Sequence, residues 1–335
     1  MGVAQKKKNP TSSVKRSGKP GAVKTVAHSA TATVKRRPIG WRDWVSAARP
    51  ATLGLALAPV VSGWGMAMLH LRAVDRETNS LTVWALTALA ALVAVFLQVG
   101  VNFANDYSDG IRGTDANRTG PQRLTASGQV EPKKVRLFAF VFFGLAALAG
   151  LAITVITQIW WLPAVGAVAI IAAWFYTGGK RPYGYAGLGE LSVFVFFGLV
   201  EVVGTVYILT NTVWLEPVLL GVAHGLFACG VLLANNMRDR ATDIAVGKRT
   251  LATRMPVWLN RVFFGIYLSG PFAVALWFAL TIPNTGWIFF ATVGALPAII
   301  IVATARTAPE YVLALKLSVW SSLGFAAIAA FTLAA

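Results

Sequence analysis

The sequence predicts an all-α integral membrane protein, and three observations support this. Hydrophobic residues make up 56% of the 335 residues. Charged residues make up only 13%, which is about half of the roughly 25% found in soluble domains. Apolar runs of about 20 residues recur along the chain, and a helix of that length crosses roughly 30 Å of hydrocarbon. Together these observations exclude an ordinary soluble domain.

Nine apolar runs are long enough to be transmembrane spans, and their polar flanks place the ends. We expect the nine helices to form a bundle. The predicted spans are residues 52–70, 82–104, 136–157, 159–176, 189–209, 213–236, 261–281, 286–304 and 311–333.

Connections rich in Lys and Arg alternate with connections that have few of them. This alternation supports the count of nine spans and gives their orientation. The odd-numbered connections carry only Arg72 and Arg76, beside Asp75 and Glu77. The even-numbered connections carry Arg112, Arg118, Arg123, Lys133, Lys134 and Arg136, then Lys180 and Arg181, then Arg238, Arg240, Lys248, Arg249, Arg254 and Arg261, and finally Arg306. Because Lys and Arg are enriched in cytosolic connections, we expect a multi-pass protein of the cell membrane with a cytosolic N-terminus. Its C-terminus is then outside.

The first 48 residues are predicted to be a disordered basic tail, followed by one membrane domain over residues 49–335. Twelve of the 30 Lys and Arg residues lie in the first 50 residues, against the single acid Asp43. This stretch is rich in Lys, Ser, Thr and Pro and has no apolar periodicity. A nucleic-acid-binding arm is an alternative, but a basic segment before a first span is common topology signalling. We therefore predict no nucleic-acid partner.

The first of two polar clusters ends the second span. Asn102, Asn105, Asp106 and Asp109 are three or four residues apart, so on a helix they share one face. Asp115 follows in the connection. Carboxylates stacked near hydrocarbon are costly unless they are compensated. Solvated helix ends, which commonly carry Asn and Asp, are the structural alternative.

A second cluster of similar form ends the sixth span on the same predicted side. Asn235, Asp239 and Asp243 again share one face of a helix. Mg²⁺ is the natural compensating ion, because it takes carboxylate oxygens and shares its other positions with substrate phosphates. The two clusters also look like corresponding sites of an internally duplicated bundle.

Cations suited to binding an anion surround the two clusters. They are Arg112, Arg118 and Arg123, then Lys248 and Arg249, and the Tyr176-Thr-Gly-Gly-Lys180-Arg181 segment between them. Some of these cations also mark topology. Phosphates bridged by metal ions and clamped by Lys and Arg are typical of diphosphate chemistry. The sequence therefore predicts a metal-dependent diphosphate site at the cytosolic membrane face.

At these residues the chain resembles the UbiA superfamily of intramembrane prenyltransferases, from about Arg49 to the C-terminus. The first family motif, Asn-Asp-x-x-Asp with a further Asp, is matched by Asn105, Asp106, Asp109 and Asp115. The second motif, Asp-x-x-x-Asp, and a Tyr-x-x-x-Lys element are matched by Asp239 and Asp243 and by Tyr176 and Lys180.

Five residues separate Asp109 from Asp115, where the commoner form of the motif has three. The longer spacing resembles the branch that acts on 1,4-dihydroxy-2-naphthoate in menaquinone synthesis. The segments Arg49-Pro-Ala-Thr-Leu53, Gly120-Pro-Gln-Arg-Leu-Thr-Ala-Ser-Gly128 and Gly247-Lys-Arg-Thr-Leu251 resemble the same branch.

The resemblance implies a helical bundle around a central cavity with the two Asp motifs at its cytosolic mouth. It implies Mg²⁺ on Asn105, Asp106, Asp109, Asp115, Asp239 and Asp243, and a diphosphate held by Asn102, Arg112, Arg123, Lys180, Asn235 and Lys248. The catalytic residues that it implies are Asp106, Asp109, Tyr176, Lys180, Asp239 and Asp243. A polyprenyl diphosphate then loses its diphosphate, and the naphthoate ring attacks the allylic cation. Loss of carbon dioxide gives demethylmenaquinone.

Several alternatives remain at this stage. Within the family, the alternative acceptor is 4-hydroxybenzoate or another quinone precursor. A CDP-alcohol phosphotransferase shares an opening like Asp106-Tyr-Ser-Asp109-Gly110, but its second acidic pair follows soon after, whereas here it begins 130 residues after Asp109. A transporter predicts polar groups near the bilayer midplane, whereas these acids gather at one face. A non-catalytic scaffold would tolerate alanine at the Asp motifs.

Overall fold

The computed structural model describes residue 2 and residues 38–76, 78–113 and 123–335, and every regular element in these ranges is helical. The described helices all belong to one compact unit, Pro38–Ala335. The elements are α1 (Trp41–Ala47), α2 (Pro50–Ala73), α3 (Ser80–Arg112), α4 (Pro132–Thr157), α5 (Leu162–Phe175), η1 (Tyr183–Ala186), α6 (Gly189–Phe194), η2 (Val195–Val200), α7 (Glu201–Thr210), α8 (Leu215–Arg238), α9 (Arg240–Ala245), α10 (Leu251–Arg254), α11 (Val257–Thr281), η3 (Thr285–Ala291), α12 (Thr292–Thr304) and α13 (Ala308–Ala334).

The all-α membrane prediction is confirmed. Eight helical segments of the described residues are long and apolar enough to cross a membrane, and α5 is a shorter apolar helix of 14 residues. These nine segments coincide with the nine predicted spans apart from their ends. The largest difference is at α3, which continues to Arg112, so the first polar cluster is helical. The fifth span, Gly189–Thr210, contains a π-helical turn at η2.

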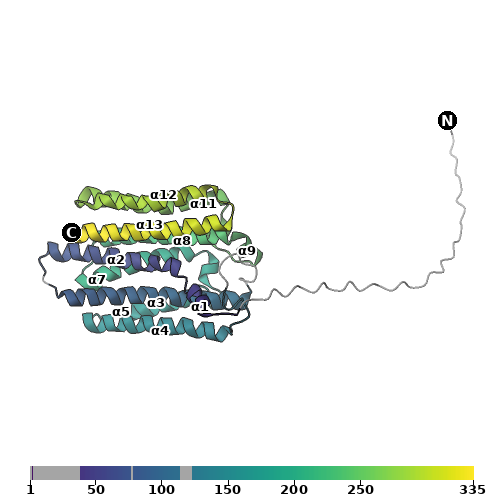
Figure 1. Cartoon of the computed structure of the whole chain (residues 1–335), viewed down its shortest axis with the longest axis horizontal. Coiled ribbons are helices and arrows are strands. Elements are labelled where there is room, and N and C mark those ends of the chain that lie inside the picture. The colour runs from purple at the N-terminus through teal and green to yellow at the C-terminus, as the bar shows by residue number, and fades with distance from the viewer. Residues whose placement is uncertain (1, 3–37, 77, 114–122) are drawn as a thin grey trace. The chain divides into compact units, whose positions relative to one another are not determined.

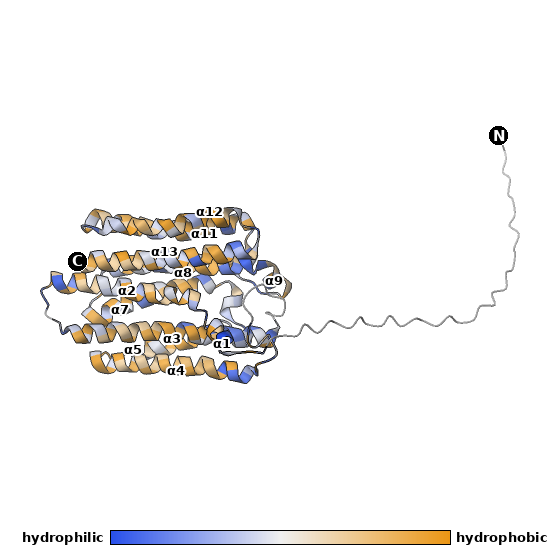
Figure 2. Ribbon diagram, viewed as in Figure 1, coloured by the Kyte–Doolittle hydropathy of each residue, from blue (hydrophilic) through white to orange (hydrophobic). Residues whose placement is uncertain are grey.

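The long helices lie side by side with their ends at two opposite faces of the bundle (Figure 1). The pairs α3 and α4, α2 and α13, and α8 and α11 are in extensive contact. Apolar residues cover the middle of the helices, and hydrophilic residues gather near α1 and α9 (Figure 2). Large apolar side chains such as Leu148, Ile171 and Ile300 are exposed, as expected where the surface faces lipid rather than water. The C-terminus lies at the end opposite α9 (Figure 1).

The compact unit begins at Pro38, so residues 38–48 differ from the predicted tail. The Trp44 ring lies 4.4 Å from the Phe138 ring and 6.0 Å from the Phe103 ring, centroid to centroid. Ala47 is buried. These contacts with α3 and α4 stabilise the short helix α1. The predicted disorder of residues 1 and 3–37 falls outside the described residues.

Close backbone contact joins the fifth span to α8. A Cβ atom on Gly198 would lie 2.4 Å from the Gly221 carbonyl oxygen and 2.7 Å from the Gly225 Cα atom. Small residues allow this approach in membrane helices. We expect Gly198→Ala to lower the free energy of unfolding by about 1–3 kcal/mol, as overpacking typically does. The thermal unfolding midpoint in detergent measures this effect.

Gly204 in the same span supplies the matched control, because a Cβ there would meet no atom within 4 Å. Gly204→Ala should leave the midpoint unchanged or raise it slightly, since Ala is the better helix former. Equal midpoints for the two variants would contradict the predicted contact.

Candidate active site

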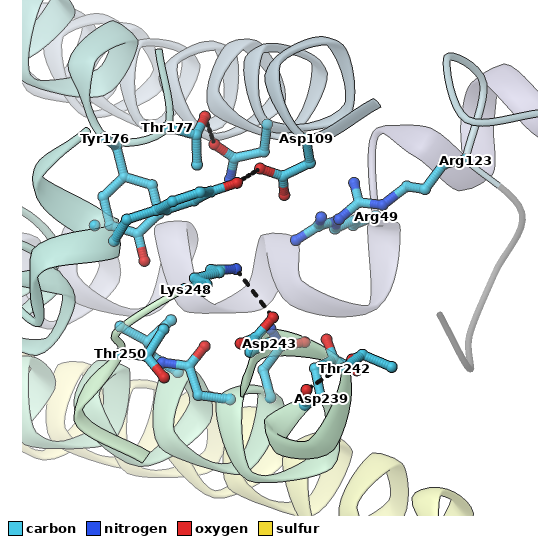
Figure 3. A pocket seen from close by; sticks show the side chains of 16 residues that line it. Arg49, Asp109, Arg123, Tyr176, Thr177, Asp239, Thr242, Asp243, Lys248 and Thr250 are labelled. Atoms are coloured by element: carbon cyan, nitrogen blue, oxygen red, sulfur yellow. Dashed lines mark hydrogen bonds and ion pairs between the residues drawn. The ribbon is translucent and has the colours of Figure 1, made fainter. Parts of the chain in front are cut away.

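A cavity of about 70 Å³ lies at the end of the bundle that carries α9, and polar side chains from five parts of the chain line it (Figure 3). Of the residues singled out in the sequence, the cavity is lined by Asn105, Asp109, Arg123, Tyr176, Asn235, Asp239, Asp243 and Lys248.

The first motif divides its residues between the cavity and the surrounding structure. Asp109 and Asn105 line the cavity, and Asn105 Oδ1 accepts a hydrogen bond of 2.7 Å from Thr177. Asn102 does not line it, since its Nδ2 donates to the Ala48 carbonyl oxygen at 2.9 Å. Asp115 lies outside the described residues.

Asp106 is fully buried and does not line the cavity. Its two carboxylate oxygens accept hydrogen bonds from the backbone N–H groups of Leu124 and Thr125, at 3.0 and 2.9 Å. Asp106 therefore anchors the turn that follows Arg123, and this turn places the Arg123 side chain at the cavity.

The second motif lies at a break between two helices rather than on one continuous helix. Helix α8 ends at Arg238, and α9 begins at Arg240. The Arg238 guanidinium forms an ion pair of 2.6 Å with Asp239 and donates to Asn235 Oδ1 at 2.8 Å. Asp243 lies 3.6 Å from Lys248. The helix is interrupted at Asp239, but backbone hydrogen bonds still join Asp239 to Asn235 and Asp243 to Asp239. All three residues of the predicted stripe line the cavity.

The predicted cations occupy different places. Arg123 and Lys248 line the cavity, together with Arg49. Arg112 instead donates to the carbonyl oxygens of Thr177 and Gly179, so it holds the loop that follows α5. Lys180 is exposed in this loop and does not line the cavity.

Tyr185 is a cavity residue that the sequence did not reveal. Its hydroxyl donates to Asp109 Oδ1, and Lys248 Nζ lies 5.0 Å from the centre of its ring. Because Lys248 also pairs with Asp243, Tyr185 connects the two Asp motifs across the cavity. A tyrosine in a loop rich in Gly and Tyr has no spacing that marks it in advance.

Tyr176 and Tyr183, after the last residue of α5, keep their phenol groups protonated. Their rings meet edge to face at 5.5 Å. Burial raises the pKa of Tyr176 well above its usual value, and the nearby Glu190 carboxylate adds to the effect. Burial also raises the pKa of Tyr183, against a smaller opposite effect from its hydrogen bond with Ser192. Both side chains are therefore neutral hydrogen-bond donors at physiological pH.

The charges around the cavity suit a diphosphate together with a divalent cation. Asp109 lies on one wall and Asp239 and Asp243 on the opposite wall, with Arg49, Arg123 and Lys248 between them (Figure 3). The three acids offset the three cations, so the cavity has little net attraction for an anion alone. A cation on the acids would leave the Lys and Arg side chains to bind phosphate oxygens.

The donor set fits Mg²⁺ in one particular way. No three acidic, His or Cys side chains come close enough to form a metal cluster within the described ranges. Mg²⁺, however, is usually held by one or two carboxylates and completed by water and substrate phosphates. Asp109 on one wall and the Asp239–Asp243 pair on the other each match that need.

A multi-pass helical bundle with both Asp motifs at one cavity is the arrangement expected of an intramembrane prenyltransferase. The model of the UbiA prenyltransferase family matches residues 56–322. The chain therefore belongs to the UbiA prenyltransferase family, and the resemblance seen in the motifs is confirmed.

Curated relatives narrow the comparison. A 1,4-dihydroxy-2-naphthoate octaprenyltransferase of Mycobacterium tuberculosis is 50% identical over 214 residues, which cover 64% of this chain and 70% of that protein. The protein of the same name from Escherichia coli is 34% identical over 260 residues, covering 73% of this chain and 80% of its own length.

Solved structures share the fold at low identity. A UbiA homologue from Archaeoglobus fulgidus bound to GPP and Mg²⁺ aligns with a TM-score of 0.54 at 14% identity, over 85% of this chain and 99% of that chain. A digeranylgeranylglyceryl phosphate synthase aligns with a TM-score of 0.53 at 13% identity, over 88% and 98% of the two chains.

Proposed function

We propose that the protein transfers a polyprenyl group from its diphosphate to 1,4-dihydroxy-2-naphthoate, with Mg²⁺ and with loss of carbon dioxide and diphosphate, giving demethylmenaquinol, the reduced form of demethylmenaquinone. The observation that carries the proposal is the single cavity lined by both Asp motifs and three cations. The naphthoate acceptor is supported by the names of relatives that are 50% and 34% identical to this chain. The Archaeoglobus homologue bound to GPP and Mg²⁺ supports the donor and the metal.

In this proposal, the residues of the cavity divide the work of binding the donor. Arg49, Arg123 and Lys248 bind the phosphate oxygens through charge-assisted hydrogen bonds. Asp109, with Asp239 and Asp243 opposite, holds Mg²⁺, which when bound stabilises negative charge on the leaving diphosphate.

The reacting carbon lies just inside the membrane from these groups. Leu232, one helical turn before Asn235 and Asn236, provides an apolar cavity wall on the side of the bundle interior. Exclusion of water protects the allylic cation from hydrolysis. The ring carbon that carries the acceptor carboxylate then bonds to the prenyl carbon as carbon dioxide departs.

We also propose the orientation in the cell membrane. The site, the connections rich in Lys and Arg and the N-terminus face the cytosol, following the excess of cations in cytosolic connections. The C-terminus, at the opposite end of the bundle, then lies outside.

The test uses purified protein in lipid with an allylic polyprenyl diphosphate and Mg²⁺, offering dihydroxynaphthoate or 4-hydroxybenzoate separately. We expect mass spectrometry to find a prenylated product without the carboxylate from the naphthoate only. Chelation of the metal with EDTA should abolish the product, and added Mg²⁺ should restore it, because diphosphate departure needs the cation.

A product formed only from 4-hydroxybenzoate would keep the reaction class and overturn the acceptor. Full activity in EDTA would overturn the role of the metal. Protein that is folded, as judged by thermal unfolding, but prenylates neither acceptor would overturn the proposed reaction.

A further inference from the structure

Glu190, at the start of the fifth span, is a buried acid to which neither family motif assigns a role. Its side chain is 6% exposed. The Asn236 amide donates to Glu190 Oε1 at 3.3 Å, and Cys229 Sγ donates to the Glu190 carbonyl oxygen at 3.2 Å. Asn236 itself lines the cavity, so Glu190 stands directly behind the cavity wall.

This part of the wall differs from the part that carries the cations. A Cβ atom on the neighbouring Gly189 would lie 3.1 Å from the Tyr176 hydroxyl oxygen and 3.2 Å from Leu232 Cδ2. Tyr176, Leu232 and Asn236 all line the cavity. Glu190 therefore lies behind a wall made of one phenol, one amide and one apolar side chain, in contact with the amide of Asn236.

A carboxylate in this position serves neither the diphosphate nor, by itself, the helix. A negative charge would repel phosphate oxygens, and no Lys or Arg of the described residues forms an ion pair with Glu190. An acid in a first helical turn does interact favourably with the helix dipole, but a buried acid pays a desolvation cost that a solvated one avoids. Besides its contact with Asn236, such an acid can serve the second substrate, the aromatic acceptor.

The chemistry of the acceptor supplies a matching donor. Ring hydroxyl groups make an aromatic ring electron-rich, and a hydroxyl that donates to a carboxylate pushes further electron density into the ring. Hydrogen bonds to charged groups are stronger than neutral ones. A site built around a substrate hydroxyl also rejects analogues that lack it, because its buried polar groups are then left unpaired.

We propose that Glu190, oriented by Asn236, accepts a hydrogen bond from a ring hydroxyl of the aromatic acceptor and so selects hydroxylated rings beside the diphosphate. This inference rests on the proposed function and names the acceptor side of the same site. Arg49, Arg123 and Lys248, which line the same cavity, serve the diphosphate donor.

The test compares the wild-type full chain with Glu190→Gln in lipid nanodiscs. Gln keeps the shape and an oxygen for Asn236 but loses the charge. We expect the KM for dihydroxynaphthoate to rise at least tenfold while the KM for the polyprenyl diphosphate changes less than twofold. A purely structural role would not separate these two constants. The wild type should reject an analogue whose ring hydroxyl groups are methylated. The ratio of kcat/KM for dihydroxynaphthoate to kcat/KM for this analogue should be at least tenfold smaller in Glu190→Gln.

Glu131→Gln is the matched control, because Glu131 is an exposed acid that precedes α4 and makes no capping hydrogen bond through its side chain. Its kinetic constants should equal those of the wild type. An unchanged acceptor KM and unchanged discrimination in Glu190→Gln would overturn the inference while the wild-type product upheld the proposed function. Wild-type protein that prenylates no ring would overturn both.

Discussion

Asp239→Asn should reduce the turnover number by about a thousandfold, which corresponds to about 4 kcal/mol of lost transition-state stabilisation. Asp239 is 7% exposed at the cavity and faces Asp109 across it (Figure 3). Asn keeps the size of the side chain but removes the charge that the proposed metal needs. We expect the Mg²⁺ concentration for half-maximal activity to rise and high Mg²⁺ to restore part of the turnover. Steady-state rates over a series of Mg²⁺ concentrations measure both effects.

Glu216→Gln is the control for this experiment, since Glu216 is an acid in the first turn of the same helix, at the opposite end from Asp239. It should leave the Mg²⁺ dependence unchanged. Asp239 also pairs with the buried guanidinium of Arg238, so the unfolding midpoint of Asp239→Asn must be compared with the wild type. A folded variant with the Mg²⁺ dependence of the wild type would contradict a metal-binding role for Asp239.

The spans were predictable because their signals are local. Apolar runs and flanking cations placed all nine segments, including α5, and the spacing of Asn105 and Asp109 placed both side chains on the face of α3 that lines the cavity. Helical periodicity needs no knowledge of the partner helix. The separation of Asp106 from that face was not predictable, because its partners Leu124 and Thr125 belong to a turn 18 and 19 residues later.

The ends of the membrane domain and the choice among cations depended on tertiary contacts. The basic composition before residue 49 hid the short helix α1, which gains its stability from the contacts of Trp44 with Phe103 and Phe138. Arg112 and Arg123 follow the same motif, yet one binds backbone carbonyl groups and the other lines the cavity. Sequence shows that cations are near the site, but only the path of the loops decides which of them reach it.

The same distinction leads to a second expected result, that Asp106→Asn and Asp109→Asn fail for different reasons. The Asp106 carboxylate accepts hydrogen bonds from the backbone N–H groups of Leu124 and Thr125. In Asp106→Asn, the side-chain NH₂ group must face one of these two N–H groups, so one hydrogen bond is lost. An unsatisfied buried donor costs about 1–3 kcal/mol. In buffer without Mg²⁺, we expect hydrogen exchange at these two amides to become about ten- to a hundredfold faster, since about 1.4 kcal/mol is a factor of ten.

Asp109→Asn is the matched control, because Asp109 accepts from Tyr185 rather than from this turn. It should leave hydrogen exchange at the Leu124 and Thr125 amides unchanged. It should raise the Mg²⁺ concentration that gives half-maximal turnover. Because the turn places Arg123 at the cavity, Asp106→Asn should also raise the KM for the polyprenyl diphosphate. Unchanged exchange in metal-free Asp106→Asn, together with a loss of Mg²⁺ affinity, would show that Asp106 acts as a metal ligand. Asp106 and Asp109 would then both bind the metal. In the structure, by contrast, Asp106 holds the turn at Leu124 and Thr125, and Asp109 lines the cavity.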